Sequence, residues 1–426
     1  MNNSLSDRWQ KPLRLLFYAT YMFFFNYYYL ASTMFWFCLG EFKPTLITCS
    51  ERTVTWLFVL AVINFLFVYD GLRERLLFVL LFVPLFCLFA TESYRFYEII
   101  ACLLLILSAK NVSFKVVGWI SVICGSAWML SSAIACHLGY LPDVINRGRH
   151  SFGSIYFTDL CCHILVLFIT LCILRNGRLK LYEYIAAAIL IVINVKYMQA
   201  KVGLICLLVL LFGTMFYQYL IPRMHINVSL LKSVMKYLIG AFVILAVLMT
   251  LITLSYSPDP DVWYHKYSFF HTLEMRFRFG YQAFQNYEIL PFGQLVTEVG
   301  NGARTDGGPA ETYFLDISYI RLLFIYGWVI LLVVMILYTQ LQVNLYKKKC
   351  FYLMFVVAVF ALDCSVEHHM VDLSYCILPY LLFARYEWVH AKSAISPCTV
   401  CSTRPRCYLQ PLLRSTRIHS HHRDCW

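Results

Sequence analysis

The chain has 426 residues, of which 61% are hydrophobic and only 14% are charged. Soluble domains carry about 25% charged residues, so this composition excludes a soluble globular protein. The formal net charge of +12 does not indicate nucleic-acid binding, because basic loops that face anionic lipid account for most of it. The 17 cysteines lie mostly within apolar segments, where thiols behave as small apolar side chains, and indicate no disulfide framework.

Long apolar runs dominate the sequence and predict an all-α polytopic integral membrane protein. A helix of about 20 apolar residues spans a bilayer, and about twelve such runs occur. The first follows Arg8, Lys11 and Arg14 and is typical of a signal anchor. The runs lie near residues 15–38, 53–69, 76–90, 97–109, 116–136, 155–174, 181–197, 202–221, 234–254, 313–338, 351–365 and 371–388.

The placement of lysine and arginine between these runs predicts the orientation. Cytoplasmic loops of membrane proteins carry an excess of these residues. With the N-terminus inside, the cytoplasmic side receives about twice as many of them as the outer side, and reversing the chain reverses that ratio. We therefore expect both termini on the cytoplasmic side.

Two predicted outer loops are longer than the other connections, at about 138–154 and about 255–312. Loops longer than about 12–15 residues are usually functional or disordered. The second loop holds too many aromatic residues for a solvated linker. We expect it to form a partly folded outer subdomain, with an amphipathic helix near 268–287 lying at the membrane interface.

The composition changes after residue 390 and divides the chain into a transmembrane domain, 1–390, and a tail, 391–426. The tail is rich in arginine, which favours a basic cytoplasmic tail without fixed structure. Residues appended by a shifted reading frame would look similar. Zinc binding is the alternative, but the ligand spacing is irregular. The residues concerned are Cys398, Cys401, Cys407, His419, His421, His422 and Cys425.

An arginine-rich segment in the first outer loop is the clearest candidate binding site. Arg147 and Arg149 flank Gly148 and are followed by His150. Guanidinium groups bind phosphate through paired hydrogen bonds, and cations on the outer side of a membrane protein need a reason. We expect an anionic ligand; the alternative is pairing with bilayer phosphates. Asp159, about one turn into the next span, is placed to contact this segment.

Four further cations lie on the predicted outer side. Lys201 begins a span and either binds ligand or anchors the helix at the interface. Arg276 and Arg278 lie two positions apart in the predicted loop helix, so they point to different sides and only one would face a ligand. Arg304 lies in the same loop. Anchoring of a helix at the headgroups is the alternative for the arginines.

Acidic residues and histidines supply candidates for proton transfer. Asp316 and Arg321 lie about 140° apart on a helix, so each should pair with a different segment. Glu367, His368 and His369 occupy a predicted outer turn, where a carboxylate beside imidazoles suits general-base work. A plain polar turn is the alternative. Metal binding is disfavoured, because neighbours in one turn rarely supply three ligands to one ion.

Over roughly residues 120–390 the chain resembles the Wzy-type polysaccharide repeat-unit polymerases. The first outer loop contains Arg147-Gly-Arg-His-Ser-Phe-Gly153, which resembles that family's arginine-rich segment before a span. A later span begins with Gln199-Ala-Lys201 and Gly203, which is similar to the family's Ser-Arg-x-Gly element. In this chain Ala200 and Lys201 replace the serine and the arginine.

Two further segments carry the resemblance, in the same order along the chain. After the large loop comes Glu311-Thr-Tyr-Phe-Leu-Asp316 with Ile325-Tyr-Gly327, which resembles an acidic residue followed by Tyr-Gly. Before the final span comes Ser365-Val-Glu-His-His369 with Leu373-Ser-Tyr375, which resembles a Glu-His element.

The resemblance implies glycosyl transfer on the outer face of a bacterial cytoplasmic membrane. A glycan on undecaprenyl pyrophosphate would be joined to a lipid-linked repeat unit, for O-antigen, capsule or exopolysaccharide. The implied catalytic residues are Glu367, His368 and Asp316. The implied pyrophosphate- or substrate-binding residues are Arg147, Arg149, His150, Lys201, Arg276, Arg278 and Arg304.

The same resemblance implies no cofactor and no metal, because the donor is already activated. The absence of a Walker loop and of a dinucleotide fingerprint agrees with this. Expected partners are lipid-linked oligosaccharides and the flippase and chain-length regulator of the same pathway. An O-antigen ligase-type transferase is the nearest alternative. A lipid-linked oligosaccharide flippase is the alternative from another class, but it predicts charges spread along an internal path and pseudo-repeats.

Overall fold

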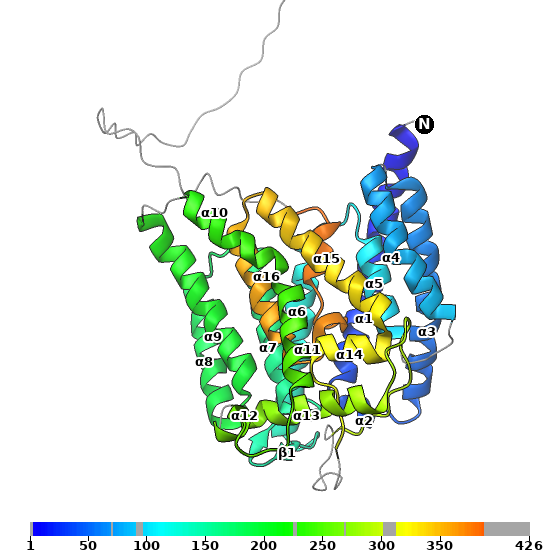
Figure 1. Cartoon of the computed structure of the whole chain (residues 1–426). Coiled ribbons are helices and arrows are strands. Elements are labelled where there is room, and N and C mark those ends of the chain that lie inside the picture. The colour runs from blue at the N-terminus through cyan, green and yellow to red at the C-terminus, as the bar shows by residue number, and fades with distance from the viewer. Residues whose placement is uncertain are drawn as a thin grey trace, which may run out of the picture.

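In a computed structural model, which describes residues 3–69, 71–90, 97–224, 228–267, 270–300 and 312–386, the chain is a bundle of α-helices (Figure 1). The first helices are α1 (Asn3–Ala31), α2 (Phe35–Cys38), α3 (Phe42–Phe67), α4 (Leu72–Ala90), α5 (Tyr97–Ser108), α6 (Phe114–His137), α7 (Phe157–Leu174), α8 (Leu181–Ile193) and α9 (Lys201–Met215). They are followed by α10 (Val228–Tyr237), α11 (Ala241–Leu254), α12 (Trp263–Lys266), α13 (His271–Asn286), α14 (Ser318–Arg321), α15 (Trp328–Lys347) and α16 (Phe351–Asp363).

Short elements join these helices. A hairpin is formed by β1 (Ile145–Asn146) and β2 (Arg149–His150). π-Helical turns are η2 (Asn194–Met198), η3 (Phe216–Leu220) and η6 (Leu322–Tyr326). 3-10 turns are η4 (Ile221–Arg223), η5 (Leu238–Gly240), η7 (His369–Val371) and η8 (Leu378–Leu382).

The apolar helices agree with a polytopic membrane protein. Among the described residues, seven helices are long and apolar enough to cross a membrane, and two shorter apolar helices, α5 and α16, accompany them. The long ones are Phe42–Phe67, Phe114–His137, Phe157–Leu174, Leu181–Met198, Lys201–Arg223, Leu231–Leu254 and Trp328–Lys347. The all-α class is therefore supported, whereas the number of twelve spans and the orientation stay predictions.

The last predicted span, 371–388, is wrong as an α-helix over its described part. Residues 371–386 form only 3-10 turns and irregular chain, and most of them are buried. This segment runs alongside α5. The amide of Leu373 donates to the Glu98 carboxylate at the start of α5, and the amide of Arg385 donates to the carbonyl oxygen of Val112 just beyond the end of α5. Pro379 offers no amide for a helical hydrogen bond. Such backbone is tolerated in a membrane protein because other helices enclose it.

The predicted run 313–338 is interrupted at Gly327. This residue has φ +88° and ψ 162°, a conformation that is essentially restricted to glycine. It separates α14 and η6 from α15. The first amides of α15 donate to the large loop, from Trp328 to Leu290 at 3.2 Å and from Val329 to Pro291 at 3.1 Å. The first amides of a helix have no carbonyl partner within the helix, and here the loop supplies those carbonyl groups.

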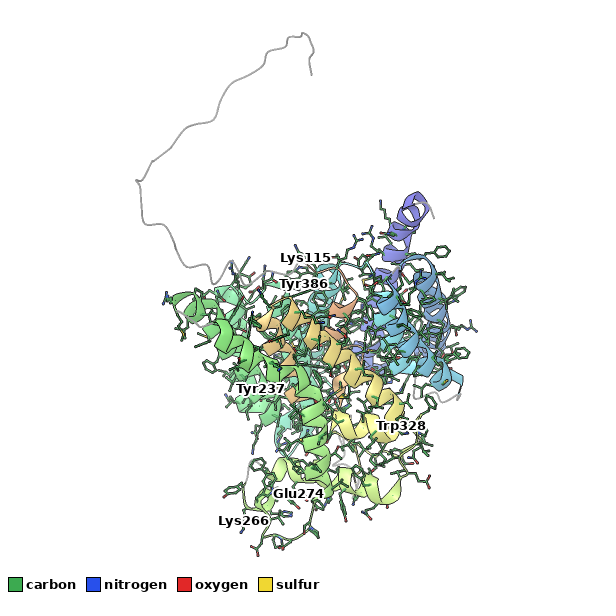
Figure 2. All side chains as sticks on the ribbon, turned by 45° about the horizontal axis from the view of Figure 1, so that its top comes forward. Lys115, Tyr237, Lys266, Glu274, Trp328 and Tyr386 are labelled. Atoms are coloured by element: carbon green, nitrogen blue, oxygen red, sulfur yellow. The ribbon has the colours of Figure 1, made fainter. Side chains whose placement is uncertain are left out.

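The two long predicted loops gather at one end of the bundle, which we call the hairpin end. Figure 1 shows β1, α12 and α13 together there. In Figure 2, Lys266 and Glu274 lie at this end, whereas Lys115 and Tyr386 lie at the opposite one. The predicted loop helix is confirmed as α13, which packs against α11. α7 is buried along most of its length among α6, α9 and α16, so its first turn brings side chains to the centre of the hairpin end.

Candidate active site

The candidate site is centred on the turn that follows α16. The amide of Glu367 donates to the carbonyl oxygen of Asp363 at 2.9 Å and closes this turn. Ser318, at the start of α14, holds it from the other side: its hydroxyl donates to the carbonyl oxygen of Glu367 and accepts from the amide of Met370. The Glu367 side chain is only 5% exposed. The predicted polar turn is therefore a buried turn.

Arg276 of α13 joins two carboxylates that the sequence predicts to be catalytic. Its Nη2 donates to Oε1 of Glu367 at 2.8 Å, and its Nε lies 3.5 Å from Oδ2 of Asp316. The predicted role of Arg276 as a pyrophosphate ligand is not supported, because both carboxylates already use its charge. Arg278 lies over the Phe279 ring at 5.2 Å and forms no ion pair with a described residue. The two arginines thus differ in direction, as their spacing predicts.

These carboxyl groups lie outside the membrane-spanning helices, and their protonation is shifted. Burial raises the pKa of Glu367 to about 8, although Arg276 opposes the shift. Burial also raises the pKa of Asp316, again against the effect of Arg276. One guanidinium cannot compensate two buried carboxylates fully. Glu367 is consequently a stronger base than a solvated glutamate.

His369 lies between two further carboxylates. Its Nδ1 is 2.7 Å from Oδ2 of Asp372, and its Nε2 is 3.5 Å from Oδ1 of Asp159. Burial lowers the pKa of His369, but the two carboxylates outweigh it and raise the pKa to about 10. His369 is therefore an imidazolium at neutral pH. Burial and repulsion from His369 lower the pKa of His368 well below its ordinary value, which keeps that ring neutral.

Several buried atoms of the site have no hydrogen-bond partner among the described residues. They are Oε2 of Glu367, Nδ1 of His368, Nε2 of His369, Nε of Arg276 and Oδ1 of Asp363. Nearby, ligand atoms of Asp316, Glu367 and His368 lie within 4.8 Å of one another. Because buried polar atoms are nearly always hydrogen-bonded, these unpartnered atoms indicate the position of a polar ligand.

The same side chains are close enough to hold a metal ion, but their charges oppose one. Arg276 touches two of the carboxylates and His369 carries a proton, and positive charge at this distance repels a cation. The expectation that no metal is bound stays a prediction. The three sets with suitable distances are Cys162 with Glu367 and His369, His368 with His369 and Asp372, and Asp316 with Glu367 and His368.

Arg321 ties the large loop to this region. Its Nη1 donates to Oε1 of Glu298 at 2.6 Å, and the same oxygen accepts from the amide of Leu315 at 3.0 Å. Asp316 pairs with Arg276 instead. The prediction that Asp316 and Arg321 find separate partners is therefore confirmed.

The arginine-rich segment forms the hairpin beside this site. β1 and β2 pair antiparallel, with Asn146 opposite Arg149. Arg147 and Gly148 make the turn with φ +52° and +76°, as the favoured two-residue hairpin turn requires positive φ at both positions. Glycine adopts this conformation easily, and the turn leaves Arg147 exposed.

Asp143 organises the loop around the hairpin. Its carboxylate accepts from the amides of Ser151 and Phe152, each at 3.0 Å, and lies 2.6 Å from Nδ1 of His150. His150, a predicted substrate-binding residue, is thus engaged within the loop. Asp159 is predicted to contact this segment; among the described residues it forms its ion pair with His369 instead, and Asp143 supplies the carboxylate beside His150.

The two hairpin arginines keep their charge available. Arg149 stacks over the Phe157 ring at 5.1 Å, and neither Arg147 nor Arg149 forms an ion pair with a described carboxylate. Tyr156 connects them electrostatically with the buried site. Its pKa is raised to about 12 by burial and by Asp316, while Arg149 opposes the shift. Arg149 and Asp316 therefore both act on Tyr156.

Two predicted binding residues remain, Lys201 and Arg304. Lys201 begins α9 and is exposed. The preceding turn η2 contacts the hairpin, where the Tyr197 ring meets the His150 ring edge-on at 5.9 Å, so Lys201 belongs to the same end. Arg304 lies outside the described residues.

Sequence reasoning considered Asp159 but missed His163 of α7 and the joint contact of the two with the turn after α16. Asp159 and His163 are four residues apart and therefore share one helix face. Asp159 reaches His369, and the His163 ring stacks with Tyr375. Two polar residues at helical spacing in an apolar span were the available signal.

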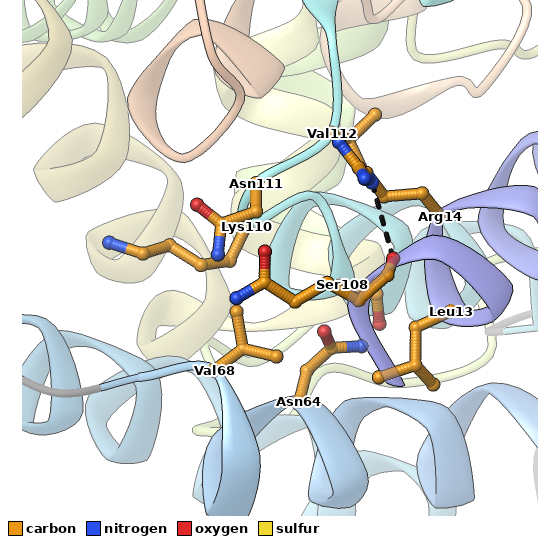
Figure 3. A pocket seen from close by; sticks show the side chains of 9 residues that line it. Leu13, Arg14, Asn64, Val68, Ser108, Lys110, Asn111 and Val112 are labelled. Atoms are coloured by element: carbon orange, nitrogen blue, oxygen red, sulfur yellow. Dashed lines mark hydrogen bonds between the residues drawn. The ribbon is translucent and has the colours of Figure 1, made fainter. Parts of the chain in front are cut away.

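A pocket occurs elsewhere and does not belong to this site. Figure 3 shows it between α1, α3 and α5, at the end of α5 remote from Glu98. Lys110 there donates to both oxygens of Glu74 at 2.6 Å, and is thus neutralised. The lining residues are Gln10, Leu13, Arg14, Asn64, Val68, Ser108, Lys110, Asn111 and Val112.

Comparisons with protein-family models, with curated proteins and with solved structures find no match. The site is therefore interpreted from its own residues.

Proposed function

We propose that the chain polymerises undecaprenyl-pyrophosphate-linked oligosaccharide repeat units at the outer face of a bacterial cytoplasmic membrane. The hairpin end would face outward, and each transfer would release undecaprenyl pyrophosphate. The main support for the proposal is that a buried carboxylate and a pair of arginines without an ion-pair partner among the described residues occur at the same end of the bundle. A buried carboxylate with an unpartnered oxygen, on Glu367, shares the hairpin end with arginines that have no carboxylate partner in the described part of the chain.

The buried half of the site suits the acceptor sugar. An acceptor hydroxyl attacks the anomeric carbon of the donor, and its proton passes to Oε2 of Glu367. Nδ1 of His368 is free to accept a second hydroxyl hydrogen bond. Arg276, whose Nε pairs with Asp316, holds the other Glu367 oxygen in place. A positioned base with a pKa near the working pH contributes about 10²–10⁴-fold to such a step.

The hairpin half suits the leaving group. As the new glycosidic bond forms, the bond between the anomeric carbon and the pyrophosphate oxygen breaks, and negative charge grows on the pyrophosphate. Arg147 and Arg149 can hydrogen-bond that charge, with Lys201 at the same end. The leaving pyrophosphate supplies the driving force, so the step balances without a nucleotide.

A complementation experiment tests this function. In cells that lack the wild-type gene, lipid-linked single repeat units should accumulate, and the wild-type chain should restore long polymer. The Arg147→Ala/Arg149→Ala and Glu367→Gln variants should lose polymer by about 10²-fold or more. Lys266→Ala is the matched control, because Lys266 is an exposed cation at the same end and should leave polymer unchanged.

The glycan products discriminate the alternatives. A ligase-type transferase would leave polymer length normal but block attachment to the final acceptor. A flippase would remove all outer-face intermediates. Full-length polymer in both variants would show that the proposed chemistry does not use this site.

A further inference from the structure

Five rings form a continuous buried stack that ends in the candidate site. The stack starts at Tyr29 of α1 and continues through His163 of α7 to Tyr375. It then reaches His369 and His368. Successive ring centroids lie 3.9, 4.0, 3.8 and 3.9 Å apart, and the first three pairs are within 20° of parallel.

Polar contacts fix the first half of the stack. Ser32, in the turn just after α1, lies 2.8 Å from Nε2 of His163 with its hydroxyl. His163 is only 1% exposed. Its ring is thus held against rotation by a hydrogen bond at its edge and by tyrosine rings on both faces. A leucine would fill this space without requiring the hydrogen bond.

Polar contacts also fix the second half. Asp372 lies at hydrogen-bonding distance, 2.7 Å, from Nδ1 of His369, and Asp159, one turn before His163, forms a longer ion pair with Nε2 at 3.5 Å. The carbonyl oxygen of Asp372 accepts from the amide of Tyr375 at 3.0 Å. The carboxylates hold the His369 ring in its own plane, and Tyr375 prevents tilting out of it. One unit therefore contains the ring stack and both carboxylates.

This unit controls the residues that face the unpartnered position. Glu367 and His368 lie in a turn rather than in a helix, so helical hydrogen bonds do not set their side-chain directions. His369 is the next residue along the chain. We propose that Tyr29, His163 and Tyr375 are positioning residues that fix the His369 ring and thereby direct Glu367 and His368 at the acceptor hydroxyl. This inference rests on the proposed function.

Paired substitutions separate positioning from packing. Tyr29→Phe should be neutral, because the Tyr29 hydroxyl has no hydrogen-bond partner among the described residues. Tyr375→Phe should keep most activity, since it loses only a 3.5 Å contact to the carbonyl oxygen of Asp159. Tyr375→Leu and Tyr29→Leu remove a ring from the stack. Each should lower kcat by about 10–10²-fold, as misplacement of reacting groups by about 1 Å does, with little change in KM.

A remote stack gives the matched control. Tyr352 stacks with Tyr217 at 4.4 Å near the opposite end, and Tyr352→Leu should lower Tm by a similar amount while leaving kcat unchanged. Rates are measured per folded protein in proteoliposomes, with lipid-linked repeat units isolated from cells lacking the gene. A kcat loss in Tyr375→Leu no larger than in Tyr352→Leu would overturn the inference, as would equal losses in the Phe and Leu variants.

A spectroscopic measurement works even if the chain makes no polymer. Ring signals of labelled histidine in nanodiscs report the orientation and mobility of His369 directly. In the wild type and in Tyr375→Phe the His369 signals should be sharp and should have the same chemical shifts. In Tyr375→Leu they should shift and broaden, whereas Tyr352→Leu should leave them unchanged. Unchanged His369 signals in Tyr375→Leu would overturn the positioning role without bearing on the polymerase proposal.

Discussion

At the scale of single residues, Arg276 is the strongest example of a charge used inside the protein. Its side chain is 10% exposed and contacts both Glu367 and Asp316. Removing one partner of a buried ion pair leaves an uncompensated charge, which costs far more than losing an exposed pair. Arg276 therefore has a structural consequence that can be measured separately from catalysis.

We expect Arg276→Met, measured above pH 8 where Glu367 is ionised, to lower the free energy of unfolding by about 3–5 kcal/mol, because two buried carboxylates then lose their counter-charge. Thermal unfolding of the purified chain in nanodiscs measures the change. Arg278→Met is the control, since Arg278 stacks on Phe279 and forms no ion pair with a described residue, and it should cost about 1 kcal/mol or less. Equal destabilisation by the two substitutions would contradict the ion-pair geometry.

The protonation of Glu367 gives a second residue-scale prediction. With a pKa raised to about 8 by burial, Glu367 is mostly protonated at lower pH and cannot accept the acceptor's proton. The charged groups that act on it are Arg276, Asp316, Asp363 and His369. The polymerisation rate should therefore fall about tenfold per pH unit below pH 8 and level off above it.

Initial rates between pH 6 and pH 9 in buffer-matched proteoliposomes check this profile (a range of about 3 units). Lys266→Ala should reproduce the wild-type curve. Glu367→Gln should lose the pH-dependent rate and leave only a low, flat residual. A wild-type rate independent of pH across the same range would argue against Glu367 as the base.

At the scale of elements, the crossing between the large loop and α15 depends on two glycines. Gly293 and Gly327 both have positive φ. A Cβ on Gly293 would collide with the carbonyl oxygen of Ile325, and one on Gly327 with that of Pro291. Backbone atoms cannot move aside as a flexible side chain can. The close contact between the two segments therefore requires glycine at both positions.

Gly327→Ala and Gly293→Ala should each lower Tm well beyond the effect of positive φ alone. The control is Gly139→Ala, because Gly139 has φ +79° with no atom within 4 Å of its would-be Cβ. That substitution should cost only the backbone strain of about 1–2 kcal/mol. Scanning calorimetry of the three variants measures the difference, and a Gly327→Ala loss no greater than that of Gly139→Ala would refute the collision.

The sequence predicts α13 and the opposed directions of Arg276 and Arg278 because helical spacing is a local property. It does not predict the partner of Arg276, since Glu367 is 91 residues away and no local pattern joins them. The sequence also does not predict the break in the helix at Gly327, because the residues on both sides of it are apolar. The non-helical course of 371–386 depends on the helices that enclose it. Local spacing thus predicts elements, whereas the site arises from their packing.

At the scale of the whole molecule, the ends of the bundle differ in what they carry. The hairpin and helices α12 and α13 of the large loop lie together at one end (Figure 1), and α13 carries Arg276 to Glu367 in the turn after α16. The basic Lys347-Lys348-Lys349 turn follows α15 and lies at the other end of that helix. Lysine and arginine placement predicts that the hairpin end faces outward. This orientation decides whether the site can meet lipid-linked glycans that have already crossed the membrane.

Protease sites inserted into two exposed turns test the orientation. One follows Gly148, which has open space around it, and the other follows Lys349, which is exposed at a turn. Protease added to intact spheroplasts should cut only the first chain, because the membrane shields the second turn. After permeabilisation both should be cut at similar rates, which controls for accessibility of the turns. Cleavage after Lys349 alone in intact spheroplasts would place the buried carboxylates and hairpin arginines on the cytoplasmic side, where pyrophosphate-linked acceptors have not yet been flipped, and the polymerase proposal would fail with the orientation.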